Sequence, residues 1–186
     1  MRVITLEDHF WTAEIAEAIG ALRNPDAASG SPLEANLADL GERRLAAMVA
    51  AGNDVQVISH TTPGVQHLDA DTATPLARDA NDRLARAVQE HPRRFAGFAT
   101  LPTAAPGVAA DELERAVTDL GLKGAMVNGH TNGRFLDDPE FDVLLEGDDA
   151  HGRILPRRGP PAPSGAQAGV LTAAMCVRLR PACLAA

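Results

Sequence analysis

The feature that most constrains this chain is a short apolar run followed by an amphipathic segment, repeated along its first 146 residues. The apolar runs have the length of buried strands and are bounded by turn or helix signals. They are residues 3–6, 55–59, 95–99 and 124–127. Strands that alternate with amphipathic helices are typical of a parallel α/β fold. Because a (β/α)8 TIM barrel needs eight such units, the pattern predicts a partial barrel, about its first four βα units.

Helix signals separate the runs. Gly52 is expected to end a helix whose apolar face includes Val49, Thr74-Pro75 to open the next helix, and Asp138-Pro139 to cap the last one. The connection at 24–32 has turn chemistry without periodicity, so we interpret it as a surface loop beside a site.

The charge of the chain limits its partners. The formal net charge is -8, whereas affinity for nucleic acids depends on lysines and arginines that neutralise phosphates. We therefore expect no nucleic-acid partner and no membrane partner. No apolar run approaches the length of a membrane span and the N-terminus lacks a signal-like stretch, so a cytoplasmic location is expected. Cys176 and Cys183 lack the spacing of a redox or zinc site.

The pattern stops near Gly147, and we divide the chain into a domain of residues 1–146 and a tail of residues 147–186. All 25 acidic residues lie at or before Asp149, while five of the 17 basic residues come later. The tail is basic, rich in proline, glycine and alanine, and without helical or strand periodicity. Two explanations are a disordered tail and translation out of frame. We favour the second, which the other two frames of the coding DNA would test.

Candidate metal ligands follow the first strand. Parallel sheets bind ligands at the carboxyl ends of their strands, where Glu7 and His9 lie. Residues two apart on a strand project the same way, so this carboxylate and this imidazole could hold one divalent ion. The alternative is a capped strand end with a surface histidine.

Three other polar residues lie at strand ends and are candidates for binding a substrate. His60 follows the second strand, and Asn128 and His130 follow the fourth. For both histidines the alternative is an exposed loop residue without function, and for Asn128 it is a role in fixing the turn at Gly129. His67 and His91 are expected on the surface. The catalytic residues remain unknown.

Several longer motifs, taken together, resemble one family. They are Leu6-Glu7-Asp8-His9-Phe10, Ala50-Ala51-Gly52 with Val55-Gln56-Val57-Ile58-Ser59, Ala80-Asn81-Asp82, Arg94 to Pro102, and Gly124 to His130. In this order they look like the decarboxylase-like branch of the amidohydrolase superfamily, which includes the γ-resorcylate, 2,3-dihydroxybenzoate and aminocarboxymuconate-semialdehyde decarboxylases. The resemblance covers about residues 3–146.

The resemblance implies a (β/α)8 barrel with one divalent metal, zinc or manganese, held by Glu7 and His9 plus a histidine and an aspartate from later strands. The later ligands have no counterpart here, and the role of the fifth-strand ligand does not transfer to His151. The implied reaction is non-oxidative loss of CO2 from a small aromatic or conjugated carboxylic acid.

Since two ligands are too few for a catalytic ion, we expect weak metal binding and an inactive, truncated chain with its catalytic groups in the missing second half. Three alternatives remain: a metal-dependent hydrolase of the same superfamily, a non-catalytic half barrel that self-associates as a homo-oligomer through exposed strand edges, and, with less support, a flavodoxin-like nucleotide binder.

Overall fold

A computed structural model gives the fold, and it describes residues 1–20 and 32–145. The elements in chain order are β1 (Ile4–Phe10), α1 (Ala13–Gly20), α2 (Pro32–Ala38), α3 (Glu42–Ala51), β2 (Val55–His60), α4 (Ala70–Glu90), β3 (Phe95–Gly97), α5 (Pro106–Thr118), a 3-10 turn η1 (Pro139–Phe141) and α6 (Asp142–Leu145). The predicted tail at 147–186 and most of the predicted loop at 24–32 lie outside the described residues.

The strands form one parallel sheet in the order β1-β2-β3. A parallel bridge between Ala99 and Ala125 places the fourth predicted strand segment, residues 124–127, beside the chain that continues from β3. Among the strands at 4–97, the order in the sheet therefore follows chain order, as in a barrel wound in one direction, and these strands lack the reversal of a flavodoxin-like sheet. The predicted α/β class with a partial barrel is confirmed.

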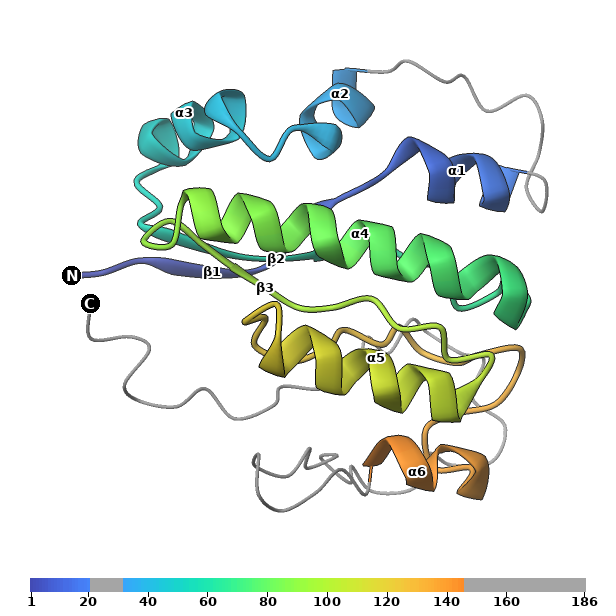
Figure 1. Ribbon diagram of the computed structural model, residues 1–186. Coiled ribbons are helices and arrows are strands. Elements are labelled where there is room, and N and C mark those ends of the chain that lie inside the picture. Colours follow the sequence, from blue (N-terminus) through green and yellow to red (C-terminus); the bar gives the residue numbers. More distant parts are fainter. Residues whose placement is uncertain (21–31, 146–186) are drawn as a thin grey trace, which may run out of the picture.

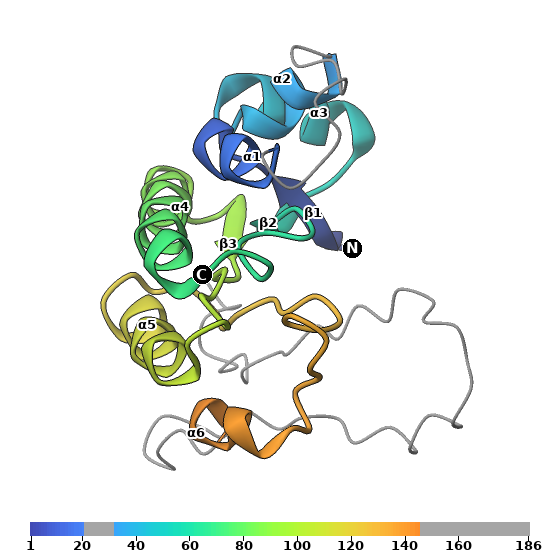
Figure 2. The same cartoon turned by 90° about the vertical axis from the view of Figure 1, so that its right-hand side faces the viewer.

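Helices cover one face of the sheet. Figures 1 and 2 show α4 and α5 along this face, with α1, α2 and α3 gathered beyond β1. The main core lies between the helices and the sheet, where Ile58 packs with Ala77 and Leu84 of α4. A smaller cluster of Val57, Phe98 and Met126 forms a separate group. Since Val57 and Ile58 are adjacent on β2, this cluster lies on the opposite face, which becomes the interior of a closed barrel.

Two predicted helix boundaries can be compared directly with the structure. Gly52 ends α3 in the left-handed conformation with φ of 73°, as predicted. The predicted start of α4 at Thr74-Pro75 is wrong, because Asp69 caps the helix by accepting a hydrogen bond from the Thr72 amide at 3.0 Å. Within the described residues, no helix combines the length and apolarity needed to cross a membrane.

Candidate functional site

The carboxyl ends of β1 and β2 meet at one histidine and one serine. His9 and Ser59 are register partners on these parallel strands. The His9 Nδ1 lies 3.1 Å from the hydroxyl of Ser59, which is fully buried. In the described part of the chain, nothing hydrogen-bonds to the other ring nitrogen, Nε2. The ring is therefore held at one nitrogen and able to present the other to a ligand.

The register places this pair on the interior face of the partial barrel. Ser59 follows Val57 by two residues and shares its face, and cross-strand partners lie on the same side of a sheet. Asp8 lies on the helix-covered side, where its Oδ1 accepts a hydrogen bond from the Gln56 side chain at 3.1 Å. The sequence alone did not indicate a role for Ser59, nor that Asp8 and His9 lie on opposite faces of the sheet.

An arginine of α3 supports the end of β1. The Arg44 guanidinium donates to the carbonyl oxygen of His9 at 2.7 Å and to the Gln56 side-chain oxygen at 3.4 Å. Burial lowers the pKa of Arg44, and Asp8 and Asp39 counteract that shift by stabilising the cation. These contacts fix the backbone that carries His9.

Glu7 differs from the prediction in its backbone. Between Thr5 and Asp8 the pairing advances by three residues on β1 and by two on β2, so β1 contains a bulge. Glu7 lies in this bulge with φ of 61°, a left-handed conformation that costs a non-glycine residue roughly 1–2 kcal/mol. The regular alternation from which Glu7 and His9 were expected to project together is therefore interrupted. Bulges beside functional sites often redirect a side chain in this way.

His60 is buried and fully hydrogen-bonded. Its Nδ1–H donates to the Thr61 carbonyl at 3.0 Å, and its Nε2 accepts from the Thr12 amide at 3.3 Å. Burial lowers the pKa of His60 to about 4, so the ring is neutral at physiological pH. The alternative of an exposed loop histidine is wrong, because His60 ends β2 and is only 4% exposed.

Asn128 and His130 lie on one turn after the fourth predicted strand. Asn128 is half-buried, and in the described structure its side-chain amide makes no hydrogen bond. His130 is exposed, accepts a hydrogen bond from the Gly133 amide at Nδ1, and lies 5.5 Å from the ring of the exposed His67. The backbone of Asn128 is held by Gln66, which the sequence did not single out.

The candidate metal site has two protein ligands among the described residues. His9 and Glu7 supply an imidazole and a carboxylate, which suit a divalent ion. However, residues 1–20 and 32–145 contain no group of three or more histidine, cysteine, aspartate or glutamate side chains that could hold a metal ion. The donor types fit, but their number falls short of the three protein ligands usual for a catalytic zinc site.

Known proteins resemble most of this chain in sequence. The amidohydrolase family model matches residues 8–158. A γ-resorcylate decarboxylase from Polaromonas sp. is 41% identical over 128 residues, which are 68% of this chain and 38% of the relative.

Solved structures give the same result. A 5-carboxyvanillate decarboxylase from Novosphingobium aromaticivorans, complexed with manganese and 4-hydroxy-3-methoxy-5-nitrobenzoic acid, is similar with a TM-score of 0.72 and 38% identity, over 78% of this chain and 47% of that one. A 2,6-dihydroxybenzoate decarboxylase in complex with 2,6-dihydroxybenzoate is similar with a TM-score of 0.69 and 33% identity, over 79% and 47% of the two chains. The chain thus spans less than half the length of these relatives.

Proposed function

This chain belongs to the amidohydrolase family, and from that membership we propose that it serves the metal-dependent, non-oxidative decarboxylation of an aromatic carboxylic acid. The observation that carries the proposal is the placement of His9 on the interior face of the partial barrel, with Nδ1 held by Ser59 and Nε2 without a hydrogen-bond partner among the described residues. Relatives that are 33–41% identical over this region are decarboxylases of such acids.

In this proposal Glu7 and His9 are the first-strand ligands of zinc or manganese. A divalent ion held by these two residues would supply a Lewis acid for the substrate carboxylate. The protein side chains hold the ligands in place: Ser59 orients the imidazole of His9, and the bulge sets the direction of Glu7. Because the described residues do not complete the site, we propose that this chain by itself binds metal weakly and is inactive.

On the substrate side, Asn128 and His130 are proposed to contact the small carboxylic acid. Asn128 offers an amide without a partner in the described structure, and His130 offers Nε2. Both nitrogens of His60 bind backbone groups, so we propose that His60 holds the entry to α1 at Thr12 and does not contact the substrate directly.

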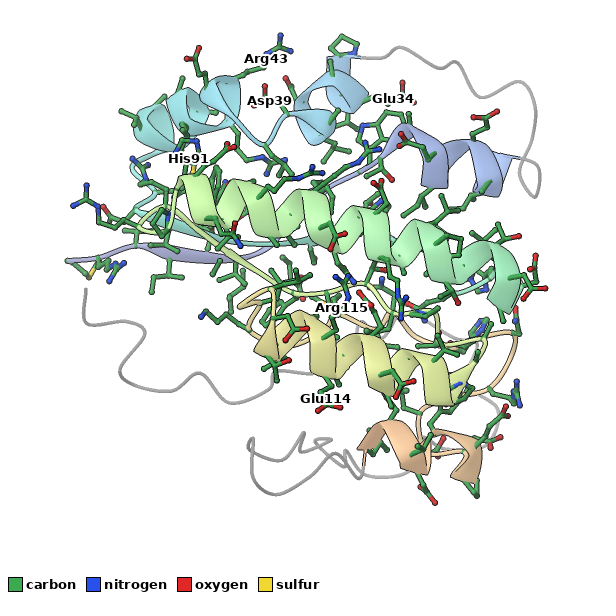
Figure 3. All side chains as sticks on the ribbon, in the orientation of Figure 1. Glu34, Asp39, Arg43, His91, Glu114 and Arg115 are labelled. Atoms are coloured by element: carbon green, nitrogen blue, oxygen red, sulfur yellow. The ribbon has the colours of Figure 1, made fainter. Side chains whose placement is uncertain are left out.

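Manganese binding and CO2 release test the proposal together. The purified chain is titrated with Mn2+ while electron paramagnetic resonance reports the free ion, and CO2 release from 2,6-dihydroxybenzoate is followed in the same samples. Glu7→Gln and His9→Asn are compared with His91→Asn, because His91 lies at the opposite end of the strands (Figure 3). We expect weak Mn2+ binding that both site variants abolish and the control retains. Binding that is unaffected by both site variants would contradict the proposal.

A second candidate function, self-association of a non-catalytic half barrel, is favoured by one observation. Ile4 and Leu6 of β1, the strand at one end of the sheet order, are 41% and 60% exposed. An exposed apolar edge strand promotes pairing with another chain. Sedimentation velocity of the wild type and of Leu6→Lys tests this candidate, which requires an oligomer that the lysine variant dissociates.

A further inference from the structure

A buried glutamine joins two loops at the carboxyl ends of the strands. Gln66 lies between β2 and α4 and is 3% exposed. Its side-chain oxygen accepts a hydrogen bond from the backbone N–H of Asn128 at 2.6 Å, and its side-chain nitrogen donates to the backbone carbonyl of Asn128 at 3.0 Å. The amide of Gln66 therefore pairs with both backbone groups of Asn128, as a neighbouring strand would.

The same side chain reaches the rest of the turn. The Gln66 nitrogen is 3.5 Å from the carbonyl oxygen of His130 and 3.5 Å from the hydroxyl of Thr131. Thr131 is 2% exposed, and its hydroxyl lies 2.6 Å from that of Thr103, which is fully buried. A satisfied network of this kind has one low-energy arrangement, because each buried polar group loses its partner if the turn shifts.

This arrangement separates the backbone of Asn128 from its side chain. Gln66 occupies the backbone N–H and C=O, while the side-chain amide has no partner in the described part of the chain. Gly129 follows with φ of 61°, which turns the chain so that His130 is exposed beside Asn128. The turn thus presents an amide and an imidazole, groups that can bind a carboxylate or a phenolic hydroxyl.

We propose that Gln66 is a positioning residue for ligand binding, which holds Asn128 so that its side-chain amide meets the carboxylate or phenolic hydroxyl of the bound acid. The inference rests on the proposed function for the identity of the ligand, and on the Gln66 contacts alone for the position of Asn128. Gln66 itself does not touch the ligand, since its amide is already engaged.

The full chain offers a matched control. Gln66→Leu removes the amide while keeping a side chain of similar size, and Gln89→Leu does the same at an exposed glutamine near the end of α4. The first readout is hydrogen exchange of the backbone N–H of Asn128, measured by NMR without ligand. Loss of Gln66 is expected to speed this exchange about tenfold, the effect of one lost hydrogen-bonded pair, while Gln89→Leu leaves it unchanged.

The second readout is the dissociation constant for 2,6-dihydroxybenzoate, measured by NMR titration in the presence of Mn2+. Asn128→Ala is expected to weaken binding about tenfold in the wild-type and Gln89→Leu backgrounds, and to have no further effect in Gln66→Leu. A merely structural glutamine would give additive effects. If Gln66→Leu does not fold, Gln66→Glu replaces it, because a carboxylate accepts from the Asn128 amide but cannot donate to the carbonyl.

The outcomes separate the two proposals. Equal exchange of the Asn128 amide in both leucine variants would overturn the positioning role, and so would additive effects on the dissociation constant. If the wild type itself does not bind 2,6-dihydroxybenzoate, the proposed function fails and takes the ligand role of Gln66 with it, while amide exchange still decides whether Gln66 holds Asn128.

Discussion

The Nδ1 atom of His9 lies 3.1 Å from the hydroxyl of Ser59, although the two residues are 50 positions apart in the chain. Parallel pairing of β1 and β2 brings them together, and the fully buried serine has little freedom to move. A histidine that binds a metal through one nitrogen usually has its other nitrogen fixed by a hydrogen bond, and the Ser59 hydroxyl is in place to make one.

Replacing Ser59 by alanine should therefore weaken the Mn2+ binding that His9 supports. The expected loss is about tenfold in affinity, at the lower end of what second partners of metal-bound histidines contribute. The measurement is Mn2+ titration by electron paramagnetic resonance. Thr118→Ala, which removes an exposed hydroxyl from the end of α5, serves as the control. Equal affinities in the two variants would show that Ser59 does not orient His9.

The left-handed backbone at Glu7 predicts an unusual order of stabilities. Glycine adopts φ of 61° without strain, whereas alanine retains the strain of glutamate. Glu7→Gly should be more stable than Glu7→Ala by about 1 kcal/mol in urea unfolding, although glycine normally destabilises a strand. Both variants should lose metal binding equally. An alanine variant that is the more stable of the two would place Glu7 in an ordinary extended conformation.

A buried carboxylate joins α4 to α5. Glu112 is fully buried and bonds to Arg115 at 2.8 Å, to Arg78 at 3.2 Å and to the Asn81 side chain at 2.7 Å. Glu112→Gln should lower the free energy of unfolding by about 3 kcal/mol, the lower end for a broken buried pair, because both arginines are partly exposed.

The control for this change lies two residues away. Figure 3 shows Glu114 pointing away from α5, whereas Arg115 extends toward α4. Glu114→Gln should change the free energy of unfolding by less than about 0.5 kcal/mol, as at most surface positions. Similar losses in the two variants would mean that the Glu112 pairs do not stabilise the helix contact.

His60 should make stability depend on pH. Its pKa is 6.5 as the ordinary value and about 4 in the folded chain, because burial disfavours the charged ring. As the pH falls, the unfolded chain therefore binds a proton at His60 before the folded chain does. The contribution of neutral His60 to the free energy of unfolding is complete above pH 6.5 and is lost as the pH falls toward 4. The loss amounts to about 3 kcal/mol. Urea unfolding of the wild type and of His60→Gln across this range tests it: a constant difference between them would contradict the prediction.

Local signals predicted much of the fold. Gly52 and Asp138 were identified as helix boundaries because capping depends on residues within one turn, and both act as predicted. Leu84, which belongs to an apolar period of four residues along α4, is fully buried. Val49 was expected on the buried face of α3 but is 65% exposed, since the neighbouring elements, not the period alone, decide which part of a face is covered.

The site was less predictable, because its contacts span large separations in the chain. Sequence indicated His9 from its place at a strand end, but Ser59 becomes its partner only through strand register. Gln66 meets Asn128 across 62 positions, and no local pattern marks it. The bulge at Glu7 exists only as a mismatch between two strands, so β1 read alone appears regular.

Because of that bulge, the number of residues in β1 affects the position of Glu7 as much as their identity does. Thr5 pairs with Gln56 and Asp8 with Ile58, so one residue between them is in excess. Deleting the single codon for Leu6 would leave Glu7 opposite Val57 and restore a regular ladder, with every other pairing kept. The ladder itself would tolerate this deletion, because each β1 residue would again face one residue of β2. The backbone at Glu7 would then leave its left-handed conformation, and the carboxylate would change direction. The number of residues in β1, and not only their identity, therefore determines where the Glu7 carboxylate lies.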